Sequence, residues 1–174
     1  MDLGILILRV VLGLLFMGHG AQKLFGWFGG YGVAGTAGWL ESLGFRAGKP
    51  MALAAGLSEL GGGLLIALGL LSPLGAAAVI GMMITAIATV HLGKGPWAAS
   101  GGWELNATNI AAAAVVGFAG PGRYSLDKLA GWDLSGLEWG AAAVTGAAVT
   151  SLLTLATRRR QVPVEAVATQ SQAA

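Results

Sequence analysis

A histidine, a glutamine and a lysine lie within five residues of one another at the end of a long apolar run near the N-terminus. The stretch is FMGHGAQKLFGW, residues 16–27, and its polar members are His19, Gln22 and Lys23. An imidazole can accept or donate a proton near neutral pH, and an ammonium group donates hydrogen bonds to oxygen. His19 and Lys23 are four residues apart, so a helix presents them on one face. These residues predict a polar site at the end of a membrane-spanning helix.

Further residues with this kind of chemistry occur in three other apolar segments. Glu59 lies within one segment, His91 ends the next, and Glu104, Asn106 and Asn109 begin the one after that. Polar and ionisable side chains are costly in hydrocarbon and normally face the interior of a bundle or a wet cavity. At 1.5 Å of rise per residue, all of these groups fall toward the same membrane face. We therefore predict one binding site built from four helices, in which Glu59 and the two histidines transfer protons.

Each of these residues also has a purely structural interpretation. Lys23 could be an anchor that reaches the membrane surface, and His91 could cap the last turn of its helix. The two asparagines could hydrogen-bond neighbouring helices. Arg9, in the opposite half of the first span, needs a partner within the membrane and joins the candidate ligand-binding residues. Glu59 is the acid at the nearest depth, so we expect these two extended side chains to pair.

The composition identifies the class of protein. Of the 174 residues, 55% are hydrophobic and 10% are charged, whereas soluble domains have about 25% charged residues. The chain is therefore predicted to be an integral membrane protein with the lipid bilayer as its solvent. It contains no cysteine, which excludes thiol chemistry and cysteine-ligated iron–sulfur clusters. A net charge of +2 gives no support to nucleic-acid binding.

Five apolar segments are long enough to be considered as membrane spans. They cover residues 3–21, 51–71, 74–92, 105–120 and 139–157, and Ser72-Pro73 between the second and third predicts a tight hairpin. The expected fold is an all-α polytopic membrane helix bundle with a four-helix core and a fifth transmembrane helix.

The predicted organisation follows from these spans. Residues 1–130 form the four-helix bundle, with a re-entrant or interfacial segment near 24–50 that contains a short helix and covers the polar site. Residues 131–157 add the C-terminal helix, and residues 158–174 form a basic cluster and a disordered tail.

The distribution of basic residues predicts the orientation. Lysine and arginine are enriched in cytoplasmic connections. Seven of them fall on one side of the predicted membrane and two on the other; the larger group is Lys23, Arg46, Lys49, Lys94 and the three arginines 158–160. We therefore expect a multi-pass protein of the plasma (inner) membrane, with its N-terminus outside and its C-terminus in the cytoplasm.

The sequence resembles the DoxX family of small membrane proteins. The resemblance runs from about residue 5 to residue 128; it includes Arg9, then GHGAQKLFGWFGGYGVAGTAGWLESLGF, then ELGGGLLIALGL with Glu59, then His91, then WELNATNIAAAAVVGFAGPGRYSLD. The family's pattern positions fall on Arg9, Gly18, Lys23, Glu59, Gly62 and the turn from Gly120 to Asp127. The resemblance implies a four-helix membrane bundle, from which the fifth span and its basic cluster depart.

The resemblance also implies redox chemistry at a membrane. Members of the family are associated with thiosulfate:quinone oxidoreductase, with tolerance of quinones and catechols, and with a membrane complex joining superoxide dismutase to a sulfurtransferase. Our leading hypothesis is a quinone-binding subunit of an oxidoreductase. Its ligand-binding candidates are Arg9, His19, Lys23, Glu59, Glu104, Asn106 and Asn109. No flavin, nicotinamide or iron–sulfur motif is visible, so we expect a partner protein or a bound cofactor to supply the electrons.

Two other hypotheses belong to different classes. In the first, His19 and His91, on alternate helices of a bundle, hold haem or a metal ion. In the second, the protein is a non-catalytic anchor for soluble redox enzymes or, ranked last, a small-solute transporter. Soluble redox enzymes and further copies of the chain are the candidate protein partners.

Overall fold

The computed structural model describes residues 1–159, and every regular element of more than one residue in this range is a helix. In chain order they are α1 (Asp2–Phe25), η1 (Trp27–Gly29), α2 (Gly32–Ser42), α3 (Gly48–Leu68), α4 (Ser72–Ala86), the π-helix η2 (Ile87–His91), η3 (Leu92–Lys94), η4 (Ala98–Ser100), α5 (Glu104–Ala119), α6 (Leu126–Leu129) and α7 (Leu137–Ala156). Arg160 and the tail predicted to be disordered lie outside the described residues. The expected all-α membrane bundle is confirmed.

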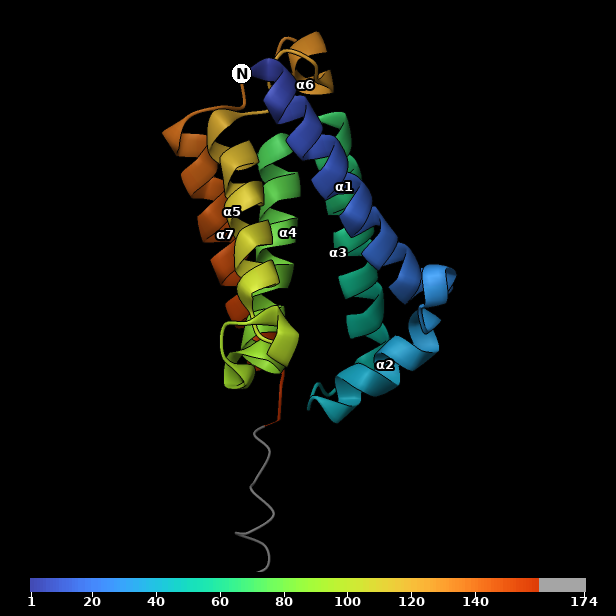
Figure 1. The fold of residues 1–174 in the computed structure, drawn as a ribbon. Coiled ribbons are helices and arrows are strands. Elements are labelled where there is room, and N and C mark those ends of the chain that lie inside the picture. The colour runs from blue at the N-terminus through green and yellow to red at the C-terminus, as the bar shows by residue number, and fades with distance from the viewer. Residues whose placement is uncertain (160–174) are drawn as a thin grey trace, which may run out of the picture.

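Within the described residues, four segments are long and apolar enough to cross a membrane. They are α1, α3, the segment Ser72–Lys94, which combines α4 with η2 and η3, and α7. The fourth predicted span corresponds to α5, which has 16 residues and is about 24 Å long. It runs beside α4 and α7 from one end of the bundle to the other (Figure 1). The chain is a multi-pass membrane protein whose N-terminus and whose α7 C-terminus lie at opposite ends (Figure 1).

The helices form two groups. α1 packs along α3, whereas α4 packs against α5 and α7, and the contact between α3 and α4 joins the groups. The predicted hairpin is present, because α3 ends at Leu68 and α4 begins at Ser72 with a proline in its first turn. Figure 1 shows the two groups diverging from each other toward the end where α2 lies.

Glycines bring α1 and α3 into direct backbone contact. A Cβ atom on Gly13 would lie 2.5 Å from the carbonyl oxygen of Gly63, and one on Gly63 would lie 2.6 Å from that of Gly13. Seven residues along α1, a Cβ atom on Gly20 would lie 2.7 Å from the carbonyl oxygen of Gly56. Such spacing of small residues is typical of closely packed membrane helices. The contact fixes the register of α1 against α3.

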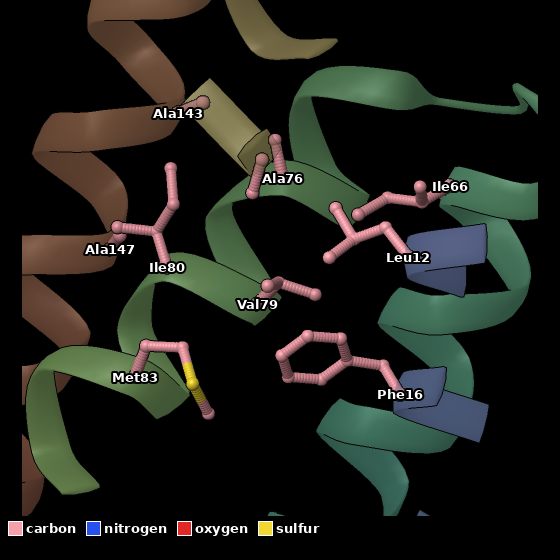
Figure 2. Packing of buried hydrophobic residues seen from close by; sticks show 10 residues of the cluster. Leu12, Phe16, Ile66, Ala76, Val79, Ile80, Met83, Ala143 and Ala147 are labelled. Atoms are coloured by element: carbon pink, nitrogen blue, oxygen red, sulfur yellow. The ribbon is translucent and has the colours of Figure 1, made fainter. Parts of the chain in front are cut away.

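The hydrophobic core surrounds α4 and reaches both groups of helices. Figure 2 shows Leu12 and Phe16 of α1 and Ile66 of α3 on the side of α4 where Val79 points. On the other side of α4, Ile80 lies beside small alanines of α7 (Figure 2). Small residues on α7 let it approach α4 closely, so the core joins α7, α4 and the α1–α3 pair.

Arg9 does not pair with Glu59, so that prediction is wrong. Its guanidinium is buried and donates to the carbonyl oxygens of Ala67 at 3.2 Å, Tyr124 at 2.9 Å and Pro121. The segment after α5 folds back over the N-terminal half of α1 and supplies two of these three acceptors. Backbone carbonyl oxygens thus stabilise the Arg9 guanidinium, for which the sequence had predicted a carboxylate partner, Glu59.

The same segment caps α4. Asp127 is fully buried, and its carboxylate accepts hydrogen bonds from Leu71 N at 2.7 Å, Ser72 N at 3.1 Å and the Ser72 hydroxyl at 2.8 Å. Free N–H groups and the helix dipole both favour a negative charge at a helix N-terminus. The turn between α3 and α4 is therefore held by a residue that follows α5.

The connection near residues 24–50 contains a helix, as predicted, but α2 is longer than the expected stretch 36–43. The residues after it are tied to the end of α7. The Arg158 guanidinium donates to the carbonyl oxygen of Leu43 at 2.7 Å and 3.0 Å and lies over the Phe45 ring, while Arg159 N donates to the carbonyl oxygen of Gly44 at 2.8 Å. The basic cluster that indicated topology also joins α7 to the loop before α3.

We predict that Gly63→Ala destabilises the protein and that the matched change Gly61→Ala does not. A methyl group at position 63 would overlap the backbone of α1, whereas nothing lies within 4 Å of one at position 61. Overpacking typically costs about 1–3 kcal/mol. The melting temperature in detergent, followed by circular dichroism, should therefore fall only for Gly63→Ala. Equal melting temperatures for the two variants would contradict the close contact between α1 and α3.

Candidate functional site

An ion pair joins the last turn of α1 to the middle of α3. Lys23 Nζ lies 2.5 Å from Glu59 Oε2, and the two side chains are 22% and 5% exposed. Gly56, one turn before Glu59, leaves room for the neighbouring Leu24 side chain, because a Cβ atom at Gly56 would lie 2.6 Å from Leu24 Cγ. Each charge stabilises the other where neither is fully hydrated. The pair explains how both groups are retained at membrane depth.

His91 ends the π-helix η2, and its orientation is fixed from outside the helix. Its Nδ1 lies 2.7 Å from the carbonyl oxygen of Gly101. A carbonyl oxygen only accepts hydrogen bonds, so Nδ1 carries the proton and Nε2 of the neutral ring carries the lone pair. Local π-helical geometry occurs frequently at functional sites. His91 thus offers a proton-accepting nitrogen at the end of the third membrane-crossing segment.

His19 has the same tautomer for a similar reason. Gln22 donates through Nε2 to the carbonyl oxygen of Phe28 at 3.2 Å, which leaves its Oε1 to accept from His19 Nδ1, also at 3.2 Å. The ring also contacts Phe16 edge to face, with 6.1 Å between centroids. Nε2 of His19 is therefore the acceptor nitrogen.

The two asparagines of α5 turn their amide nitrogens toward α4. Nδ2 of Asn106 lies 3.4 Å from Met83 Sδ, and Nδ2 of Asn109 lies 3.9 Å from the same sulfur. Asn106 is buried and Asn109 is half-buried. Because the thioether is only a weak acceptor, the bonds orient the amides without using their oxygens. Each Oδ1 remains an acceptor.

These side chains line one cavity of about 440 Å³ between the two groups of helices. Six of the predicted site residues contribute to it: His19, Lys23, Glu59, His91, Asn106 and Asn109. They come from α1, α3, the end of the α4 segment and α5, as the shared depth predicted. Two predicted residues are not among those that line it. Arg9 lies in the opposite half of α1, and Glu104 is in the first turn of α5.

Most of the cavity wall was not predicted from the sequence. Thr36 and Trp39 of α2 and Phe45 after it contribute; they belong to the segment that was predicted to cover the polar site, but they were not named among its residues. Met83 and further apolar residues complete the wall; these include Phe16, Leu40, Met51, Met82 and Leu105. A pattern of small and aromatic residues in the connection was the available signal, but it does not tell which side chains turn inward.

A second cavity, of about 500 Å³, lies between the end of α1 and α2. Its lining includes Gln22, Tyr31 and the glycines at 29, 30 and 35. Lys23, Thr36 and Trp39 line both cavities. The ion pair is therefore located where the two spaces meet.

The chain was compared with known families and proteins. Residues 4–92, which are 89 of the 174 residues, match the model of the DoxX family. This range contains His19, Lys23, Glu59 and His91 and stops before α5 and α7. No curated protein and no solved structure matches the chain.

We predict strong coupling between Lys23 and Glu59 in a double-mutant cycle. Lys23→Met leaves a buried carboxylate without its partner and should cost about 3 kcal/mol. Glu59→Gln in the same chain removes that carboxylate, so the double variant should be more stable than Lys23→Met alone. Unfolding of the four proteins in detergent measures the coupling. Additive effects of the two changes would mean that the ion pair contributes nothing to stability.

Proposed function

This chain belongs to the DoxX family of membrane proteins, and from that premise we propose that its cavity binds the head group of a quinone during a membrane redox reaction. The observation that supports this most is the placement of polar groups on facing helices around one apolar space. Lys23 and Glu59 belong to the α1 and α3 group, whereas His91 and Asn106 belong to the other. A flat ring with oxygen atoms at opposite edges matches such an arrangement.

The size and the lining of the cavity agree with this class of ligand. Its volume of about 440 Å³ lies within the range of roughly 300–1,000 Å³ found for small-molecule sites. Phe16, Leu40 and Phe45 provide apolar surface, and Trp39 provides an aromatic ring. Apolar walls with a few polar groups are typical of sites that orient an aromatic ligand.

The residues at the two edges have different roles in the proposed reaction. Lys23 donates a hydrogen bond to one ligand oxygen and remains paired with Glu59. When a hydroquinone is oxidised, its two hydroxyl groups release two protons: Nε2 of His91 accepts one, because Gly101 keeps the proton of the neutral ring on Nδ1, and the Glu59 carboxylate beside Lys23 accepts the other. The chain itself offers no cysteine for electron transfer. A soluble redox enzyme that docks on the membrane therefore supplies or takes the electrons.

The proposal includes the membrane and the orientation expected from the basic residues. The end of the bundle that carries α2 and Arg158 would face the cytoplasm, in the plasma (inner) membrane. We predict that a fluorescent protein fused after residue 174 becomes fluorescent in bacterial cells, whereas an alkaline phosphatase fused there stays inactive. The opposite pair of results would overturn the orientation and leave the cavity unaffected.

A second candidate is haem or a metal ion held by the two histidines. His19 and His91 line the same cavity, and both keep Nε2 as the free nitrogen of the neutral ring. Neutral imidazole nitrogens are good ligands for iron and for other transition metals. Such a group would supply one-electron chemistry, and the two rings would hold it from α1 and from the α4 segment.

We predict that protein purified in mild detergent retains close to one quinone per chain and that Glu59→Gln lowers this content several-fold. The matched control is Glu104→Gln, an acid on α5 that is not among the residues lining the cavity. Extraction followed by chromatography with ultraviolet detection measures the quinone. Both variants should retain the circular dichroism spectrum of the unmodified chain.

The same preparation separates the candidates. Equal trace quinone in all three proteins would contradict quinone binding. Absorption bands of haem that shift on dithionite reduction, or stoichiometric metal, would support the histidine-ligated group instead. A preparation with none of these ligands that still recruits soluble redox enzymes would support the non-catalytic anchor.

A further inference from the structure

The second cavity, of about 500 Å³, differs from the first in the residues that line it. Among the described residues, no alanine, valine, leucine, isoleucine or methionine contributes to its wall. Three glycines do, and the other lining residues are Gln22, Lys23, Tyr31, Thr36 and Trp39. A cavity needs only about 15 Å³ and two to four polar partners to hold a water molecule. This space is therefore large enough and polar enough to contain water.

The wall of the second cavity extends to the surface of the molecule. Tyr31 is 83% exposed, and Gly29 and Gly35 are exposed as well. These residues follow α1, at the end of the bundle where α2 lies (Figure 1). Water outside this end of the bundle can therefore enter the cavity.

The two members of the ion pair differ in the cavities that they line. Lys23 lines both cavities, whereas Glu59 is among the residues of the first. Nζ of Lys23 lies 2.5 Å from Glu59 Oε2, and the carboxylate side chain is 5% exposed. A head group in the first cavity covers Glu59 from that side, so the space beside Lys23 is where water still reaches the pair. A proton held by Glu59 therefore leaves toward the second cavity.

Thr36 lies where the two cavities meet and has an unused hydroxyl group. It lines both cavities, is 5% exposed, and has no side-chain hydrogen bond to any of residues 1–159. By contrast, Thr85, Thr89 and Thr154 of the first cavity donate to backbone carbonyls four residues earlier. Buried polar groups in proteins nearly always pair with protein atoms or with water. Water in the cavity is therefore the expected partner of Thr36.

We propose that the second cavity is a water-filled route through which Glu59 exchanges protons with the aqueous phase, and that Thr36 is the positioning residue that holds water at its inner end; this rests on the proposed function. The hydroxyl accepts a hydrogen bond from one water molecule and donates one to another. Once a ligand hydroxyl has given its proton to Glu59, the carboxylic acid passes it to this water, and one proton leaves the outer end of the water chain. Glu59 is then a carboxylate again and pairs with Lys23.

The first test asks whether water reaches Thr36 without crossing the first cavity. The chain has no cysteine, so Thr36→Cys and Thr85→Cys each place a single thiol in the full chain in nanodiscs; Thr85 lines the first cavity and is not among the residues of the second. Both react with 2-sulfonatoethyl methanethiosulfonate, a charged reagent confined to water, with and without a fully substituted benzoquinone that fills the first cavity. We expect the quinone to slow Thr85→Cys at least tenfold and Thr36→Cys less than threefold.

Ala52→Cys gives the rate of a fully buried thiol, because Ala52 is 0% exposed and is not among the residues lining either cavity. Thr36→Cys should react at least a hundredfold faster. A smaller ratio would mean that the second cavity is dry, and slowing of Thr36→Cys by threefold or more would mean that both cavities share one route; either result would overturn the proposal. If the quinone slowed neither thiol, the proposed function would be overturned, while the labelling rates would still show whether the second cavity holds water.

The second test follows the proton itself. The hydroquinone of the same ligand is bound to the protein and oxidised by ferricyanide in a stopped-flow instrument, so that each hydroquinone gives two electrons to two ferricyanide ions and releases two protons. Quinone absorbance follows the oxidation, and phenol red follows the arrival of protons in solution. We expect Thr36→Val to lengthen the delay between the two signals at least fivefold and Thr36→Ser to restore it. A variant that only loosens the bundle changes the oxidation rate and not the delay, and an unchanged delay in Thr36→Val would overturn the role of Thr36.

Discussion

The backbone contact between α1 and α3 is the constraint on which the candidate site depends. No side chain separates Gly13 from Gly63, so the register of the two helices is fixed by steric contact. That register brings the end of α1 to the level of Glu59 and makes a 2.5 Å ion pair with Lys23 attainable. In a medium where an unpaired carboxylate is expensive, the glycines thereby allow an acid to remain within α3.

The two ends of the bundle handle charge in different ways. At one end, backbone carbonyls accept hydrogen bonds from the terminal nitrogens of Arg9, whose Nε has no partner among the described residues, and the N-terminus of α4 donates to buried Asp127. At the other end, the ion pair and the histidines keep atoms that no described residue uses. Saturated polar groups stabilise a fold, whereas polar groups with spare capacity beside a cavity can bind a ligand. Polar atoms without a partner among the described residues therefore lie at both ends, but only those near the ion pair line the cavity.

The membrane spans and much of the site could be predicted because both depend on position along a helix. The length of an apolar run indicates a membrane-spanning helix, and the constant rise per residue gives the depth of each side chain along that helix. Six of the residues grouped by depth do line the cavity. The depth of a residue does not tell toward which side of the helix its side chain points, or which later segment of the chain it contacts. Glu104 has a suitable depth but does not line the cavity, and two of the three partners of Arg9 come from a turn more than 110 residues away. The tautomer of His91 likewise depends on a loop carbonyl.

The contact between the end of α7 and the loop before α3 has a consequence for the order of assembly. Arg158 holds the carbonyl oxygen of Leu43, next to cavity residues of α2 and Phe45, and Thr154 lines the cavity itself. These two parts of the wall are more than a hundred residues apart in the sequence, so the ribosome synthesises them at different times. Residues 4–92, which match the family model, are therefore made before the α7 part of the wall exists. The cavity is thus among the last features to form during biosynthesis, and a nascent chain that stops within α7 lacks part of it.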